Sequence, residues 1–100
     1  VDMKDNILPT YYYLEIYENS LGSSPSLSFE SSTPIGTFNT GDYFNHRNFD
    51  GWVKRPNTET EKFVITQVEH ILWKTEDSHI GHKVMICLKV VPYNWEIDKI

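Results

Sequence analysis

The sequence predicts an all-β domain, either a small barrel or a two-layer antiparallel sheet of about five strands. Three observations lead to this fold class. Several segments alternate between apolar and polar residues with the period of two that marks a half-buried strand. Short stretches rich in Gly, Pro, Ser and Asn separate these segments. The aromatic share of 14 % is high, which suits a sheet. We expect residues 1–100 to form a single domain, because a chain of this length buries enough surface for one core.

The N-terminal half contains two expected strands and one turn. Residues 11–17 and 26–30 alternate cleanly, and residues 18–25 between them hold the Ser, Gly and Pro typical of a loop. Residues 35–44 begin with an apolar segment, continue with a turn centred on Gly41 and end with the start of a strand. We therefore expect a hairpin or a tight corner there.

Residues 63–73 form the longest apolar stretch and fit two structures. At helical spacing they carry an apolar stripe behind a potential capping box, and a helix over 58–73 would make the fold α+β. Their β-branched and aromatic residues favour a strand instead, because these side chains lose rotamer freedom in a helix. A bulge near Gln67 would turn Val68 back to the core side.

The C-terminal part supplies the most regular strand. Residues 75–82 are polar and predict a turn closed by Gly81. Residues 83–91 then alternate, with Val84, Ile86, Leu88 and Val90 on one face. Pro92 ends this strand, and residues 93–97 form either a short edge strand or a packed tail.

Composition and charge restrict the class of protein. The net charge of −5 disfavours binding to nucleic acid or to an anionic membrane, and no apolar run reaches the roughly 20 residues needed to span a bilayer. Cys87 is the only cysteine, so no disulfide forms within the chain and a cytoplasmic location is the default expectation. No motif implies a cofactor, and a protein without enzymatic activity is favoured over an enzyme.

One cluster of potential metal ligands occurs in the expected turn. Glu76 and Asp77 precede His79 and His82, but a transition-metal site needs three or four converging ligands. A solvated turn explains these residues better, so we predict no metal site. Cys87 is interpreted as a small apolar filler.

A small-molecule pocket is the second kind of site that the sequence suggests. Residues 45–57 mix charged and aromatic groups in an irregular segment, where binding residues are often found. With the central strand they offer a candidate pocket formed by His46, Arg47, Trp52, His70 and Trp73. The competing interpretation is that Trp52 anchors the loop on the core while the charges stay in water.

Aromatic residues are also candidates for an interface. Tyr and Trp are favoured at protein interfaces because each combines a large rigid area with one polar group. Three consecutive tyrosines in one strand cannot all be buried by one face. The candidate interface residues are Tyr11, Tyr13, Tyr17 and Trp95.

These features support three hypotheses about function. The first is a small binding or assembly module that presents an aromatic-rich sheet surface to another protein or to a second copy of itself, as a homo-oligomer. The second is a ligand-binding barrel or small enzyme with a pocket near Trp52 and His70. The third is an acidic inhibitor or immunity-type protein that covers a basic partner, in a complex that salt weakens.

Overall fold

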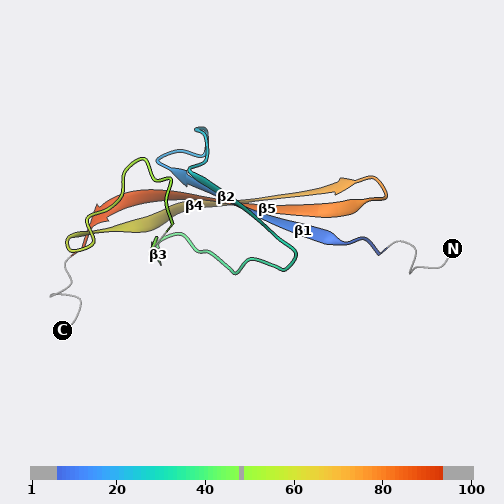
Figure 1. Cartoon of the computed structure of the whole chain (residues 1–100), viewed down its shortest axis with the longest axis horizontal. Helices are drawn as coiled ribbons and strands as arrows, with labels where there is room; N and C mark the ends of the chain where they lie inside the picture. Colours follow the sequence, from blue (N-terminus) through green and yellow to red (C-terminus); the bar gives the residue numbers. More distant parts are fainter. Residues whose placement is uncertain (1–6, 48, 94–100) are drawn as a thin grey trace.

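The computed structural model of the chain describes residues 7–47 and 49–93, and these contain strands and no helix (Figure 1). No described segment is therefore a helix long and apolar enough to cross a membrane. The strands are β1 (Thr10–Glu18), β2 (Leu27–Ser31), β3 (Tyr43–Phe44), β4 (Glu61–Thr75) and β5 (His79–Pro92). The all-β prediction is thus confirmed.

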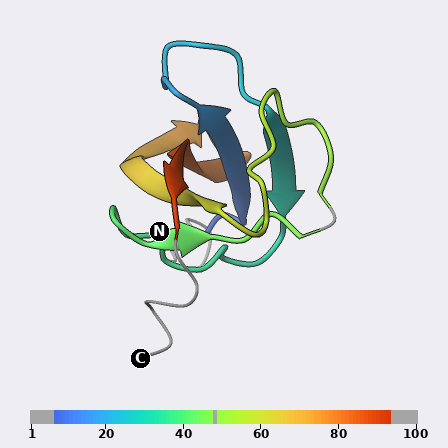
Figure 2. The ribbon, with the colours of Figure 1, turned by 90° about the vertical axis from the view of Figure 1, so that its left-hand side faces the viewer.

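The five strands form one sheet in the order β2-β1-β5-β4-β3. The sheet curls into a half-barrel, which the end-on view in Figure 2 shows as a partial ring of strands. One pairing departs from the expected antiparallel sheet, because β1 and β5 run parallel, with Leu14 beside Val84 and Ile16 beside Ile86. The other three pairings are antiparallel.

The ambiguous stretch is a strand, so the helical alternative over 58–73 is excluded. Its pairing with β5 shifts between Ile65 and Gln67, which is the bulge expected near Gln67. The bulge returns Val68 to the face that packs against the core. Phe63 and Ile65 lie before the bulge on the same face and are buried.

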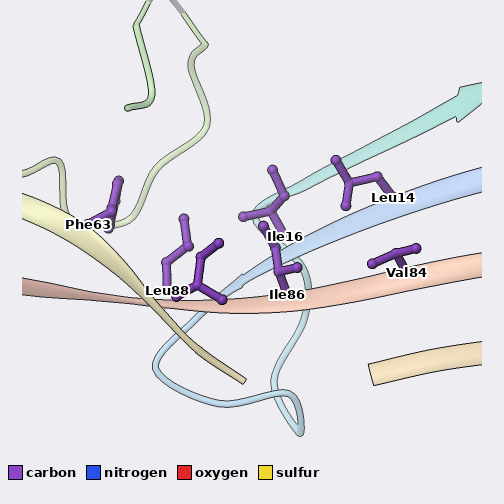
Figure 3. Close-up of a cluster of buried hydrophobic side chains, with 7 residues drawn as sticks. Leu14, Ile16, Phe63, Val84, Ile86 and Leu88 are labelled. Atoms are coloured by element: carbon purple, nitrogen blue, oxygen red, sulfur yellow. The ribbon is translucent and has the colours of Figure 1, made fainter. Parts of the chain in front are cut away.

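The core fills the concave face of the half-barrel. Leu14 and Ile16 from β1, Phe63 from β4 and residues 84, 86 and 88 from β5 point to the same side of the sheet (Figure 3). Partly buried residues from the connecting segments and shorter strands pack over them: Leu27, Phe29, Ile35, Phe38, Phe44 and Trp52. The segments before and after β3 thus take the place of a second layer.

Two side chains are buried on the opposite face. Cys87 is fully buried, as expected of an apolar filler, and Tyr17 is only 5 % exposed. The Tyr17 hydroxyl donates a hydrogen bond to Glu15 at 2.6 Å. Burial, with this acceptor as the next cause, raises the pKa of Tyr17 to about 12. The phenol therefore stays neutral in neutral solution.

The turn-side part of the β4–β5 hairpin, residues 67–75 and 79–85, is called the arm here. Val68 and Val84 at its base contact the core, and the rest extends past it. The turn of this hairpin lies at the end of the molecule remote from the segment that joins β3 to β4 (Figure 1). The turn is tighter than expected: Thr75 pairs with His79, so His79 and His82 belong to β5 rather than to a loop. Trp73 covers Gly81 on the neighbouring strand and stacks on Tyr13 of β1, with ring centroids 5.5 Å apart.

Candidate functional site

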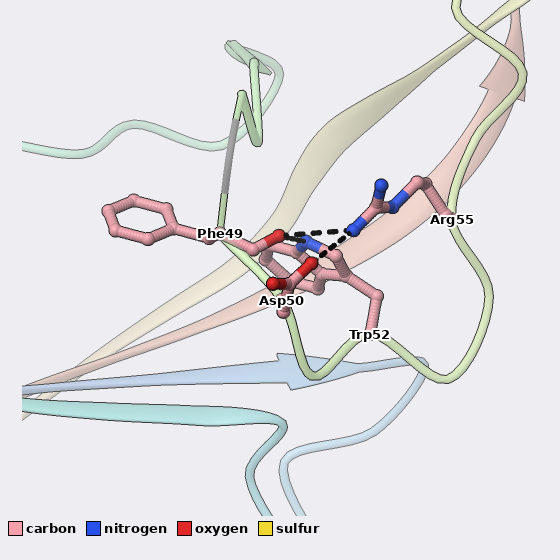
Figure 4. A network of polar contacts seen from close by, with 4 residues as sticks. All are labelled: Phe49, Asp50, Trp52 and Arg55. Carbon is pink, nitrogen blue, oxygen red and sulfur yellow. Dashed lines mark hydrogen bonds and ion pairs between the residues drawn. The ribbon is translucent and has the colours of Figure 1, made fainter.

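Trp52 anchors the segment between β3 and β4 on the core. Its ring lies against Phe63, with centroids 4.9 Å apart, and its indole Nε1 donates a hydrogen bond to the Phe49 carbonyl at 2.9 Å. Arg55 reaches the same carbonyl and pairs with Asp50 at 2.8 Å on the surface (Figure 4). The polar group of Trp52 is thus already satisfied within the chain, as the packing interpretation expects.

Glu18 connects the segment between β3 and β4 to the end of β1 through hydrogen bonds. Its carboxylate accepts hydrogen bonds from the Ser26 hydroxyl at 2.5 Å, the Val53 N–H at 2.7 Å and the Lys54 N–H at 3.0 Å. Burial alone would raise the pKa of Glu18, but the three donors outweigh it and hold that pKa below its ordinary value. The carboxylate therefore accepts its hydrogen bonds from within the chain and stabilises the position of this segment.

A small hollow opens beside His46. Phe44, Pro56, Thr58, Glu61, Lys62 and Phe63 are among the residues that line it. Its volume of ≈ 90 Å³ is well below the roughly 300 to 1,000 Å³ of typical small-molecule pockets. Trp52 does not line this hollow, although its ring centroid lies 6.0 Å from that of His46. Arg47 is exposed and lines a second, wider hollow together with His46.

His46 is buried at 7 % exposure, with its ring edge-on to Phe63. Burial, and less strongly the positive charge of Arg55, lower the pKa of its imidazole below 6.5. The unfolded chain therefore takes up this proton more readily than the folded chain. The contribution of the neutral His46 side chain to the free energy of unfolding should be at its full value at pH 8. It should decrease as the pH drops through 6.5.

We expect the substitution His46→Phe to remove this part of the pH dependence while keeping a ring in place. Urea unfolding at pH 8, 7, 6 and 5 measures it in both proteins. The free energy of unfolding of the wild type should fall relative to that of the variant below about pH 6.5. The comparison at pH 8 is the control, because the imidazole is neutral there in both states. Parallel curves for the two proteins would refute the assignment.

The other two predicted pocket residues lie elsewhere. His70 is on the arm, seven residues along β4 from Phe63, which at about 3.3 Å per residue is roughly 23 Å. Trp73 is on the arm too, against Tyr13, on the face opposite to His70. The five residues therefore do not line one pocket, and any ligand role remains a prediction for three separate places.

The structure also distinguishes among the predicted interface residues. Tyr11 is 44 % exposed and Tyr13 is half-buried beneath Trp73. Tyr17 is buried within the chain and so is unable to present its ring to a partner, which corrects that part of the prediction. Trp95 lies outside the described residues.

Three residues on or beside the arm are not among the pocket and interface residues that the sequence predicts. Leu72 is 72 % exposed, which makes it one of the most exposed large apolar side chains of the described chain. His82 contacts His70 across the hairpin, and Tyr12 lies edge-on to His82 with ring centroids 6.1 Å apart. The register that joins these residues follows from the tight turn at 76–78, which the sequence alone did not fix.

Comparisons of the chain with models of protein families, with curated proteins and with solved structures find no match. Its function is therefore inferred from the geometry of the chain itself.

Proposed function

We propose that this chain is a small assembly module whose arm pairs with a second copy of the chain along the free edge of β4. The observation that carries the proposal is this edge. β3 pairs with β4 only at Phe63 and Val64, and the last backbone contacts on that side join Ile65 to Gly41 and Asp42. In the described chain no strand pairs with the outer side of β4 beyond that point.

The register of the hairpin shows which backbone groups point outward. The Ile80 N–H donates to the Pro9 carbonyl, and the Leu88 carbonyl accepts from Asn19, so the even-numbered residues of β5 direct their backbone groups toward β1. Because pairs alternate in an antiparallel ladder, the residues opposite them on β4 direct theirs away from β5. These outward residues are Val68, His70, Leu72 and Lys74.

Such an edge is a template for strand addition. Proteins usually protect long edges with proline, bulges or inward charges. Here the bulge lies before the arm, and the arm itself carries exposed Leu72 and Ile71, the latter 40 % exposed. Water is a poor environment for both side chains, and a paired strand would cover them.

The sequence of the arm is compatible with pairing to itself. An antiparallel pairing about a two-fold axis at Ile71 sets His70 opposite Leu72 of the other copy, and Val68 opposite Lys74. Both pairs use outward-directed backbone groups. No like charges oppose each other in this register, since Glu69 faces Trp73.

Light scattering across a wide range of protein concentration tests the proposal. The mass of the wild type should rise to that of a dimer, and Leu72→Lys should remain a monomer because it places a charge at the centre of the new ladder. Val53→Lys is the matched control, since Val53 is 87 % exposed on the far segment and gains the same charge. A wild type that stays monomeric, or a Leu72→Lys variant that dimerises like it, would refute the proposal.

The alternatives gain less support. The hollow of ≈ 90 Å³ beside His46 is small for a substrate, and the wider one of ≈ 590 Å³ is lined by only four residues, Asn45, His46, Arg47 and Thr58. The acidic inhibitor is supported by the net charge of −5 alone. The cytoplasmic location remains a prediction from the single cysteine.

A further inference from the structure

The geometry points to a binding site for a divalent transition metal on the arm, formed by the imidazoles of His70 and His82. His70 pairs with Val84 and His82 with Leu72, so the two histidines are diagonal neighbours on one face of the hairpin. The Nδ1 atom of His70 lies 3.0 Å from the Nε2 atom of His82. Their rings are stacked, with centroids 5.3 Å apart.

The type of ligand selects the kind of metal. Imidazole nitrogen binds zinc, copper and nickel, and for a given site the affinity is highest for Cu²⁺. Imidazole nitrogen lies about 2.0 to 2.1 Å from a bound zinc ion, so two nitrogens that lie 3.0 Å apart can both reach one ion.

The chemistry needs no change of charge on the ligands. Each neutral imidazole carries one ring proton, and binding places it on the nitrogen that faces away from the metal. The two nitrogens now share a hydrogen bond, and the metal replaces it. Edge-on contact with Tyr12 helps hold the ring of His82 in place.

Water completes the coordination. Within the described ranges, no group of three or more His, Cys, Asp or Glu side chains converges to hold a metal. The site therefore has two protein ligands, fewer than the three or four of a tightly held metal, and it binds the ion weakly and exchangeably. It is not the His79 and His82 cluster, for which the sequence predicts no metal site. His79 packs on Tyr11 and His82 on Tyr12, and these tyrosines point to opposite faces.

The site lies within one chain and does not depend on the proposed dimer. Its test is a titration of the full chain with Cu²⁺, at protein concentrations where light scattering shows a monomer, followed by calorimetry and by electron paramagnetic resonance. We expect one Cu²⁺ per chain with coupling to two nitrogens. Irving–Williams order predicts weaker binding of Ni²⁺.

Variants decide whether these two residues are the ligands. His70→Asn and His82→Asn should each weaken Cu²⁺ binding at least about tenfold, since loss of a supporting partner alone has that effect at metal sites. His79→Asn is the matched control and should bind Cu²⁺ like the wild type. Circular dichroism shows that each variant keeps its sheet. Equal affinity in the wild type and the His70→Asn/His82→Asn double variant, or an equal loss in His79→Asn, would overturn the assignment.

Discussion

The substitution Phe63→Ala should lower the free energy of unfolding by about 3 to 5 kcal/mol, the range measured for truncating a fully buried aromatic ring. Phe63 is 1 % exposed and supports the rings of both Trp52 and His46. Its removal leaves a cavity and deprives the segment around Trp52 of its packing surface. Since a domain is stable by only about 5 to 15 kcal/mol, the loss is a large share of the total.

Urea unfolding followed by circular dichroism measures this effect. Val53→Ala is the control, because Val53 is adjacent to Trp52 but 87 % exposed, and its truncation should change stability by less than about 0.5 kcal/mol. A loss below about 1 kcal/mol for Phe63→Ala would show that this ring is not part of the core.

The substitution Gly81→Ala should weaken the arm by about 1 to 3 kcal/mol, as overpacking does elsewhere. A Cβ atom at Gly81 would lie 2.1 Å from two ring carbons of Trp73. The indole crosses β5 at this residue to reach Tyr13, so the added methyl group forces it away from its stacking partner. Both the contact over the glycine and the stacking are then lost.

Hydrogen exchange of backbone amides locates this effect, because it reports local opening. Amides of the arm should exchange faster in Gly81→Ala, while those of β1 near Ile16 change least. Gly36→Ala is the control, since a Cβ atom there meets nothing within 4 Å. If both variants were equally stable, the close approach of Trp73 to Gly81 would be refuted.

The strands were predictable because burial of one face leaves a period of two in the sequence. The bulge was predictable for the same reason, since Phe63 and Val68 need the same face but have opposite parity. The parallel pairing of β1 with β5 was not, because strand order depends on contacts between distant segments. The turn was predicted too wide, since polar residues at the end of a projecting hairpin still pair with their neighbours.

The candidate sites were also predicted only in part, because they depend on tertiary contacts. Alternation places a residue on a face of the sheet but does not say which part of that face is covered. Tyr17 was therefore expected at an interface, although it is buried. It also does not say which strands are neighbours, so His70 was grouped with Trp52 rather than with His82. The hairpin register supplies that information.

The strand order also has a consequence for how the protein is made. β5 is the central strand of the sheet, yet it is the last of the five in the chain. It contributes Val84, Ile86 and Leu88, so the core is incomplete until a ribosome has synthesised it. The paired strands β1 and β2 therefore emerge with their apolar face uncovered, and folding of the whole sheet awaits the synthesis of β5.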